Sequence, residues 1–225
     1  MMLILNCDFD ENPETNGGQL LRRQLAQLGA RNILIKNVFQ EELPSESELK
    51  TTEGIIITGS RASVYEKHNW IPELAKTLKK INALKIPTLA ICFGFQIVAQ
   101  TFGGQVEKSG TFWEGFMPIK VNNTHQLFEN FPAQVKVYHS HGDVAKTLPK
   151  DAKILATAPH AIQAFELKNF WCVQFHPEIT PQVAITMAER DGKDTEKILN
   201  RVKINYELPL LVIKNFLYSC HLNAQ

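Results

Sequence analysis

The chain lacks the features that define several broad classes of protein. Its four cysteines contain no CxxC pair and are too sparse for a disulfide scaffold, which favours a reducing, cytoplasmic setting. No apolar run approaches the ~20 residues of a membrane span, and the first residues lack the pattern of a secretion signal. With a net charge of only +1, there is no electrostatic reason to expect nucleic acid or a membrane as a partner.

What the sequence does contain is the composition of a globular protein, with 44% apolar and 21% charged residues. Apolar strand runs at 3–6, 33–35, 54–58 and 88–91 alternate with the helical apolar faces at 20–28 and 71–81. This alternation predicts an α/β fold, with an open, mostly parallel sheet and helices on both faces. In such sheets the site forms beyond the carboxyl ends of the strands, so Gly59 and Cys92 are expected at one rim.

The second half of the chain is richer in short extended runs. They predict an antiparallel extension of the sheet and are found at 112–121, 135–139, 153–158, 161–167 and 170–175. Further helices are predicted at 181–189, 194–206 and 210–218. There is no repeat or linker, so residues 1–225 are predicted to form a single domain, with 181–225 as a helical C-terminal extension. That extension has three open roles, which are packing on the sheet, contacting a second copy and covering the site. The oligomeric state is not indicated.

Cys92 lies between an apolar strand and the first turns of a helix. Gly94 is expected to allow the abrupt reversal between the two elements. The thiol would then lie at a helix N-terminus, where the helix dipole favours the thiolate. The alternative is that Cys92 is a buried small hydrophobe, as many free cysteines are.

A second stretch, 171–178, reads as a buried strand that ends in His176 and Glu178. Residues two apart on an extended chain point to the same side. An imidazole beside a carboxylate is the base that a cysteine nucleophile requires, because the carboxylate orients the ring and stabilises its charged form.

Four segments together resemble the class I (triad-type) glutamine amidotransferases, in the subgroup related to the glutaminase domain of GMP synthase. Residues 92–96 (CFGFQ) resemble the nucleophile motif of that family, and 176–178 (HPE) its His-x-Glu ending. Residues 139–143 (HSHGD) resemble the segment that contacts glutamine, and 59–65 (GSRASVY) the oxyanion loop. The matches follow the family order and cover roughly residues 1 to 180, and the implied fold is the flavodoxin-like sheet of that family.

The resemblance implies a role for each matching residue. Cys92 would attack the side-chain amide of glutamine and form a glutamyl thioester. His176 would move the protons, and Glu178 would orient His176. The backbone N–H groups of Gly59 and Phe93 would form the oxyanion hole.

By the same resemblance, Gln96 and the backbone around Ser140 and His141 would bind the α-amino and α-carboxylate groups of glutamine. Gln96 could instead be a polar residue on the helix surface. His139, His141 and Asp143 are metal-ligand types, but their spacing matches no closed zinc pattern, so we expect neither a metal nor a cofactor.

Ser60 and Arg61 depart from the family pattern, in which glycine and proline are more common, and this leaves the details of the oxyanion loop open. The sequence does not decide whether Arg61 and Tyr65 touch substrate, touch a partner or are simply exposed. Gly17-Gly18 lacks the rest of a phosphate-binding motif and reads as a turn.

The expected partners are glutamine, or a γ-glutamyl amide, and a separate synthetase subunit that receives the ammonia, because no segment of the chain resembles an acceptor-activating domain. Two other interpretations remain open. One is a stand-alone hydrolase of γ-glutamyl peptides or related amides, and the other is a non-catalytic regulatory module of the same fold.

Overall fold

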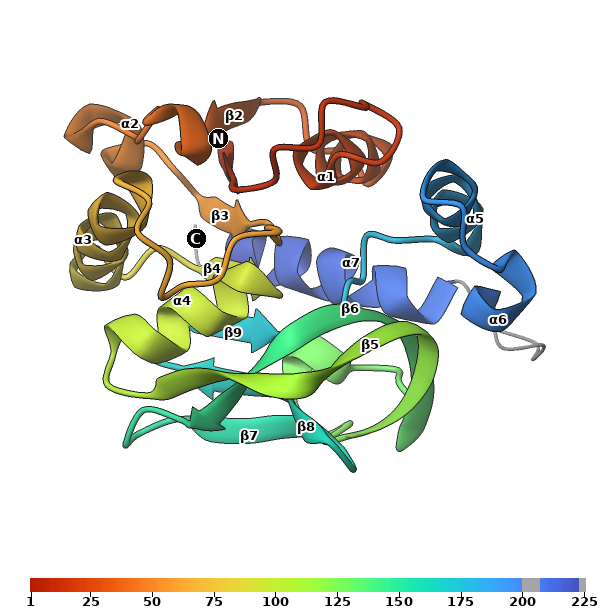
Figure 1. The fold of residues 1–225 in the computed structure, drawn as a ribbon. Coiled ribbons are helices and arrows are strands. Elements are labelled where there is room, and N and C mark those ends of the chain that lie inside the picture. Colours follow the sequence, from red (N-terminus) through yellow and green to blue (C-terminus); the bar gives the residue numbers. More distant parts are fainter. Residues whose placement is uncertain (200–206, 223–225) are drawn as a thin grey trace.

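A mixed β-sheet forms the centre of the molecule (Figure 1). The computed structural model describes residues 1–199 and 207–222. The sheet has nine strands in these residues, in the order β2-β1-β3-β4-β9-β8-β7-β5-β6. The strands are β1 (Met2–Asn6), β2 (Ile33–Asn37), β3 (Gly54–Ile57), β4 (Thr88–Ile91), β5 (Gln105–Val121), β6 (Gln134–Thr147), β7 (Lys153–Ala158), β8 (Ala161–Leu167) and β9 (Phe170–Val173). Neighbouring strands from β2 to β9 are parallel and the rest are antiparallel. The largely parallel sheet with an antiparallel extension is therefore confirmed, but the run at 170–175 differs from its prediction because β9 pairs parallel with β4.

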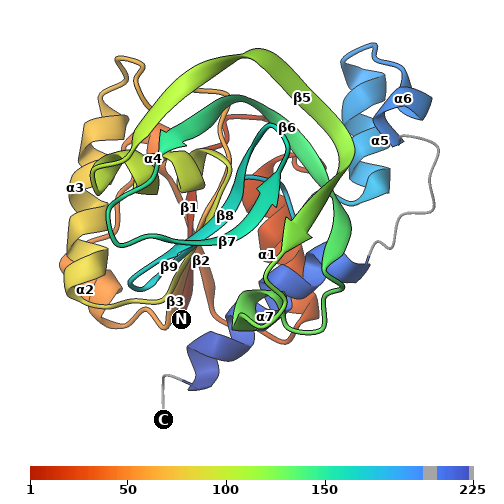
Figure 2. The ribbon, with the colours of Figure 1, turned by 90° about the horizontal axis from the view of Figure 1, so that it is seen from below.

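Helices cover both faces of the parallel part of this sheet (Figures 1 and 2). Successive strand residues alternate between the faces, so Leu3 packs in one apolar cluster and Ile4 in another. The first cluster contains the apolar sides of α3 and α4, and the second contains those of α1 and α7. The helices are α1 (Gly17–Gln27), α2 (Glu46–Lys50), α3 (Trp70–Ala83), α4 (Phe93–Thr101), α5 (Pro181–Arg190), α6 (Thr195–Leu199) and α7 (Glu207–Leu222), with 3-10 turns at η1 (Val38–Gln40) and η2 (Gln126–Phe128).

The strands β5 and β6 are much longer than the apolar runs that predicted them. They form an antiparallel ribbon in which many side chains face solvent, so most of its length has no continuous apolar run. The ribbon also contains a register shift between Lys108 and Trp113. Because β6 extends to Thr147, the segment 139–143 lies inside this strand and not at the end of a strand, as the predicted run 135–139 would have placed it.

The C-terminal helices also differ in extent from their predictions. The predicted helix at 194–206 is seen as α6, and its remainder lies outside the described residues. The helix α7 begins at Glu207, before Pro209, because proline is tolerated in the first turn of a helix. On α7, Phe216 packs in the second apolar cluster, and the Asn215 side chain donates hydrogen bonds to the carbonyl groups of Leu127 and Glu129. Part of the extension therefore packs on the sheet.

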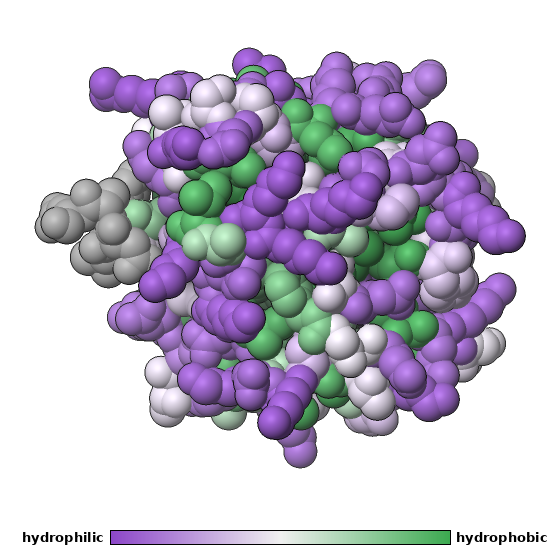
Figure 3. All heavy atoms as spheres, turned by 90° about the vertical axis from the view of Figure 1, so that its left-hand side faces the viewer, coloured by the Kyte–Doolittle hydropathy of each residue, from purple (hydrophilic) through white to green (hydrophobic). Residues whose placement is uncertain are grey.

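The outer surface beside α2 and α3 is mostly hydrophilic (Figure 3). Its apolar atoms form separate patches between polar side chains. Among the described helices, none has the length and apolar character needed to cross a membrane.

Candidate active site

Cys92 lies at a sharp turn between β4 and α4. Its backbone has φ +51° and ψ −98°, outside the regions that a residue with a side chain usually adopts. The N–H of Cys92 donates to the Val173 carbonyl (2.8 Å), and its own carbonyl accepts from the Gln96 N–H (3.0 Å). The expectation that Gly94 makes the reversal is wrong, because Gly94 does not have a positive φ. Gly94 is needed for space, since a Cβ there would lie 2.9 Å from the Ile57 carbonyl oxygen.

The Cys92 sulfur is in a polar setting at the N-terminus of α4. The Gln174 side-chain amide donates to Sγ (3.6 Å), and the Ser140 carbonyl oxygen lies 3.8 Å from Sγ. Burial raises the pKa of the Cys7 and Cys172 thiols above their usual range, which fits the prediction that both are buried hydrophobes.

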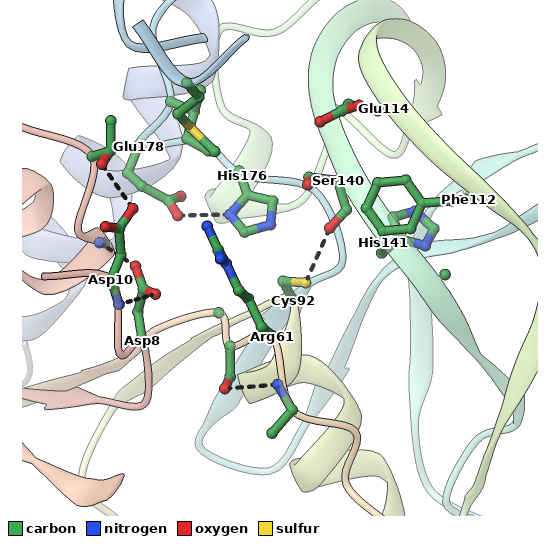
Figure 4. A pocket seen from close by; sticks show the side chains of 18 of the residues that line it. Asp8, Asp10, Arg61, Cys92, Phe112, Glu114, Ser140, His141, His176 and Glu178 are labelled. Carbon is green, nitrogen blue, oxygen red and sulfur yellow. Dashed lines mark hydrogen bonds and ion pairs between the residues drawn. The ribbon is translucent and has the colours of Figure 1, made fainter. Parts of the chain in front are cut away.

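His176 and Glu178 form a buried pair beside Cys92 (Figure 4). His176 Nδ1 lies 2.7 Å from Glu178 Oε1. The backbone N–H of His176 donates to the Tyr138 carbonyl (2.9 Å). Burial alone would lower the His176 pKa, but the Glu178 carboxylate and the neighbouring Cys92 sulfur raise it well above its usual value. The Gln24 side chain donates to the Glu178 carbonyl (2.8 Å) and so helps to hold this segment.

Gly59 follows β3 and lies against the same group of side chains. A Cβ at this position would be 2.8 Å from His176 Cε1 and 3.4 Å from the Cys92 Cβ, so only glycine fits without a shift. Phe93 is the first residue of α4, and the first N–H groups of a helix have no partner inside it. Both candidate oxyanion donors therefore lie next to the sulfur-bearing residue.

The segment that follows Gly59 is tied to β6. The Asp143 carboxylate accepts hydrogen bonds from the Ser63 hydroxyl (2.6 Å) and the Tyr65 hydroxyl (2.9 Å). Tyr65 is therefore a positioning contact for this loop, which the sequence could not decide because its partner lies 78 residues away.

The predicted substrate residues line one cavity together with Cys92. Gln96 is 3% exposed, so it is not a surface residue, and its amide donates to the Asp143 carbonyl and the Gln174 side chain (both 3.3 Å). His141 lies beside Ser140 on β6. Gln174 was not anticipated, although a glutamine inside an otherwise apolar strand run was a signal that could have identified it.

The cavity has a volume of about 450 Å³ and carries both signs of charge. Residues 187–193 supply part of its wall, so the C-terminal extension also covers the site. Arg190 pairs with Asp10, and Lys193 pairs with Glu114 (2.7 Å). The charged lining residues are Asp8, Asp10, Arg61, Glu114, Asp143, Glu178, Arg190, Asp191 and Lys193.

Three histidines gather behind this cavity, namely His139, His141 and His160, with ring nitrogens within 4.8 Å of one another. Burial lowers the pKa of His139 to about 3 and that of His141 to about 4, and it also lowers the pKa of His160, so the rings are neutral at pH 7. Asp143 does not join them through its carboxylate, which binds Ser63 and Tyr65. His160 was not singled out from the sequence, since a lone histidine in a turn carries no local signal.

Comparison with known proteins identifies a family model and several curated relatives that the chain matches. The family model "Glutamine amidotransferase class-I" matches residues 16–191. A GMP synthase [glutamine-hydrolyzing] of Campylobacter lari is 35% identical over 164 residues, which are 69% of this chain and 31% of the relative. One from Bacillus pumilus is 32% identical over 182 residues, or 80% of this chain and 33% of the relative. The chain therefore spans about a third of the length of these curated relatives.

Solved structures share the fold over nearly the whole chain. A glutamine amidotransferase from Thermotoga maritima has a TM-score of 0.80 at 19% identity, with 97% of this chain and 96% of that chain covered. A glutamine amido transferase from Methylobacillus flagellatus has a TM-score of 0.77 at 17% identity, with 99% and 94% covered. With its strand–turn–helix at Cys92 and the match over residues 16–191, the chain belongs to the class I glutamine amidotransferase family.

Proposed function

We propose that the chain hydrolyses the side-chain amide of glutamine and releases ammonia through Cys92, His176 and Glu178. The observation that carries this proposal is the convergence of three separate segments. The His176 ring lies 2.7 Å from the Glu178 carboxylate, and a Cβ at Gly59 would lie 2.8 Å from His176 Cε1 and 3.4 Å from the Cys92 Cβ. A nucleophile, a base and a group that orients the base are the parts that acyl transfer requires.

In the first step, His176 accepts the thiol proton as the Cys92 sulfur attacks the amide carbon. The developing oxyanion is stabilised by the N–H groups of Gly59 and Phe93, each worth about 3–4 kcal/mol of transition-state stabilisation. The C–N bond then breaks as His176 protonates the departing nitrogen, which leaves as ammonia. The products of this step are ammonia and a glutamyl thioester on Cys92.

In the second step, His176 takes a proton from water as the water attacks the thioester. The C–S bond breaks, the sulfur recovers a proton, and glutamate leaves. Glu178 keeps the imidazolium oriented and charged in both steps, consistent with its effect on the His176 pKa.

Charges of both signs around the cavity suit a zwitterionic amino acid. We propose that Gln96 and the backbone at Ser140 and His141 position the α-amino and α-carboxylate groups of glutamine. This is supported by the position of Gln96, which is buried and donates hydrogen bonds to the Asp143 carbonyl of β6 and to the Gln174 side chain. Gln174 in turn contacts the Cys92 sulfur.

A γ-glutamyl peptide is a second candidate substrate, because it presents the same α-amino and α-carboxylate groups. The observation in its favour is the cavity volume of about 450 Å³, which lies in the range of sites for ligands larger than one amino acid. Steady-state comparison of glutamine with γ-glutamyl dipeptides distinguishes the two. Cleavage of a dipeptide with no turnover of glutamine would contradict the leading proposal.

The decisive experiment is a glutaminase assay on the wild type and Cys92→Ala, together with mass spectrometry after treatment with diazo-oxo-norleucine. We expect ammonia release that the substitution abolishes without changing the melting temperature, and a single adduct on Cys92. Comparable turnover by Cys92→Ala would overturn the nucleophile assignment. An unmodified Cys92 with no turnover would instead favour a silent regulatory module.

We further propose that a synthetase uses the ammonia. The support is that the relatives are named GMP synthases and that this chain matches only about a third of their length. Affinity purification of the chain from its own cells, followed by mass spectrometry, should recover a synthetase subunit whose presence raises glutaminase activity. Full activity of the isolated chain with no such protein recovered would contradict a required partner.

A further inference from the structure

Three histidines from separate parts of the chain meet beside β5 and β6. His139 and His141 are alternate residues of β6, so they share one face of the strand. His160 lies in the turn between β7 and β8. One ring nitrogen from each histidine lies within 4.8 Å of the other two.

The buried ring nitrogens of this cluster have no hydrogen-bond partner. This holds for both nitrogens of His139 and for Nε2 of His141 and His160. His139 is 0% exposed and His141 is 3% exposed, and leaving a buried polar group unsatisfied costs about 1–3 kcal/mol. The Met117 backbone opposes the lowering of the His139 pKa, but it forms no hydrogen bond of acceptable geometry with either ring nitrogen. A ligand that accepts electron pairs from all three rings would remove this cost.

The protonation of His141 follows from its surroundings. Its Nδ1 lies 3.2 Å from the Asp143 carbonyl oxygen, which can only accept, so Nδ1 carries the hydrogen and Nε2 carries a lone pair. A histidine whose second nitrogen donates to a carbonyl is the usual arrangement of a metal ligand. Trp113 stacks on the His160 ring at 4.4 Å and tilts against the His141 ring at 5.5 Å, so it restrains both rings.

We propose that His139, His141 and His160 bind a zinc ion, with water in the fourth position. Three imidazoles plus an open position form an established donor set for tetrahedral zinc, whereas Mg²⁺ and Ca²⁺ prefer oxygen ligands. Tetrahedral Zn–N bonds of about 2.1 Å place the donor atoms about 3.4 Å apart, so the ring nitrogens, which lie within 4.8 Å of one another in this cluster, would move closer on binding. The ion would join the β7–β8 turn to β6, next to the cavity-lining His141, and this goes beyond the proposed hydrolysis of glutamine.

The test measures metal binding directly, with zinc itself as the probe. The full chain carries Cys92→Ser throughout, so that the neighbouring cavity offers no thiol to zinc, and it is stripped with a chelator. Equilibrium dialysis against Zn²⁺ with elemental analysis should give one ion per chain. His160→Gln should weaken binding by more than about 100-fold, beyond the effect of losing an outer-shell contact. The matched control His68→Gln removes an exposed histidine outside the cluster and should bind as tightly as the parent.

A second measurement does not depend on any histidine variant folding. X-ray absorption at the zinc edge of the loaded parent should show three imidazole nitrogens at about 2.1 Å and one oxygen. No bound zinc, or a first shell without histidine, would overturn the proposal. Equal binding by folded His160→Gln would do the same, and none of these readouts depends on turnover of glutamine.

Discussion

Cys92, the proposed nucleophile, shows how the backbone conformation of a single residue sets the position of its side chain. Its positive φ holds the sulfur at the start of α4, next to the first N–H groups of that helix. This conformation costs of order 1–3 kcal/mol, which the surrounding β4, β9 and α4 packing must offset. In this conformation Sγ lies 3.6 Å from the Gln174 side-chain amide, and Cys92 lines the same cavity as His176.

Replacing Glu178 by Gln should change the pH dependence of turnover. The carboxylate raises the His176 pKa, so the imidazolium persists to higher pH in the wild type and is lost as the pH rises through that value. Without the charge, the neutral ring that accepts the thiol proton should form at lower pH. The acidic limb of the kcat/KM profile should therefore move down by about one pH unit or more. An acidic limb that stays in place would mean that Glu178 acts only in packing, and Glu178→Asp should restore part of the shift.

Gly59→Ala should reduce kcat much more than stability. The added methyl group would lie 2.8 Å from His176 Cε1, so the ring or the Gly59 backbone must shift from its present position. Misplacing a catalytic group by about 1 Å costs on the order of 100-fold in rate. Steady-state kinetics together with a melting curve test this, and a folded variant with wild-type kcat would contradict the close approach.

At the scale of elements, α7 shows how the C-terminal extension stabilises the sheet. Phe216 is 1% exposed in the second apolar cluster, whereas Tyr218 on the same helix is 57% exposed. Phe216→Ala should lower the free energy of unfolding by about 3–5 kcal/mol. Tyr218→Ala, the matched control, should cost no more than about 1 kcal/mol, including its contact with Lys214. Urea denaturation measures both, and equal effects would show that α7 does not form part of the core.

At the scale of the whole molecule, residues from distant parts of the chain together form the wall of the cavity. Arg190, at the end of α5, pairs with Asp10 and also donates to Thr15. These contacts hold the wall formed by 187–193 against the loop after β1. Access to the cavity therefore depends on pairs that are 175 to 180 residues apart.

Arg190→Ala should show how much this ion pair contributes to the stability of the fold, and how that contribution depends on pH. Burial opposes the charge on Asp10, but hydrogen bonds from Thr15 and Asn12 and the Arg190 guanidinium lower its pKa overall. A lowered pKa stabilises the fold above the unfolded pKa of about 4, and this stabilisation is lost as the pH falls through the folded value. The pair is partly exposed, so the variant should be less stable by up to about 1 kcal/mol at pH 7. The difference should shrink below about pH 4. A difference that is unchanged at low pH would rule out the ion pair as its cause.

The sequence by itself determined the α/β class, the order of the parallel strands along the chain and the motifs around Cys92 and His176. These are local signals, because apolar periodicity and a strand followed by a turn are written in neighbouring residues. It could not determine the length of β5 and β6, since exposed and partly exposed polar residues interrupt this ribbon and leave no continuous apolar run over most of its length.

Only the tertiary structure decided that Tyr65 binds Asp143, that residues 187–193 cover the cavity and that His160 joins His139 and His141. Each of these contacts joins residues from separate segments of the chain. The order of the strands in the sheet brings these separate segments together. The spacing of the residues in the sequence has no periodicity from which their contacts could be predicted.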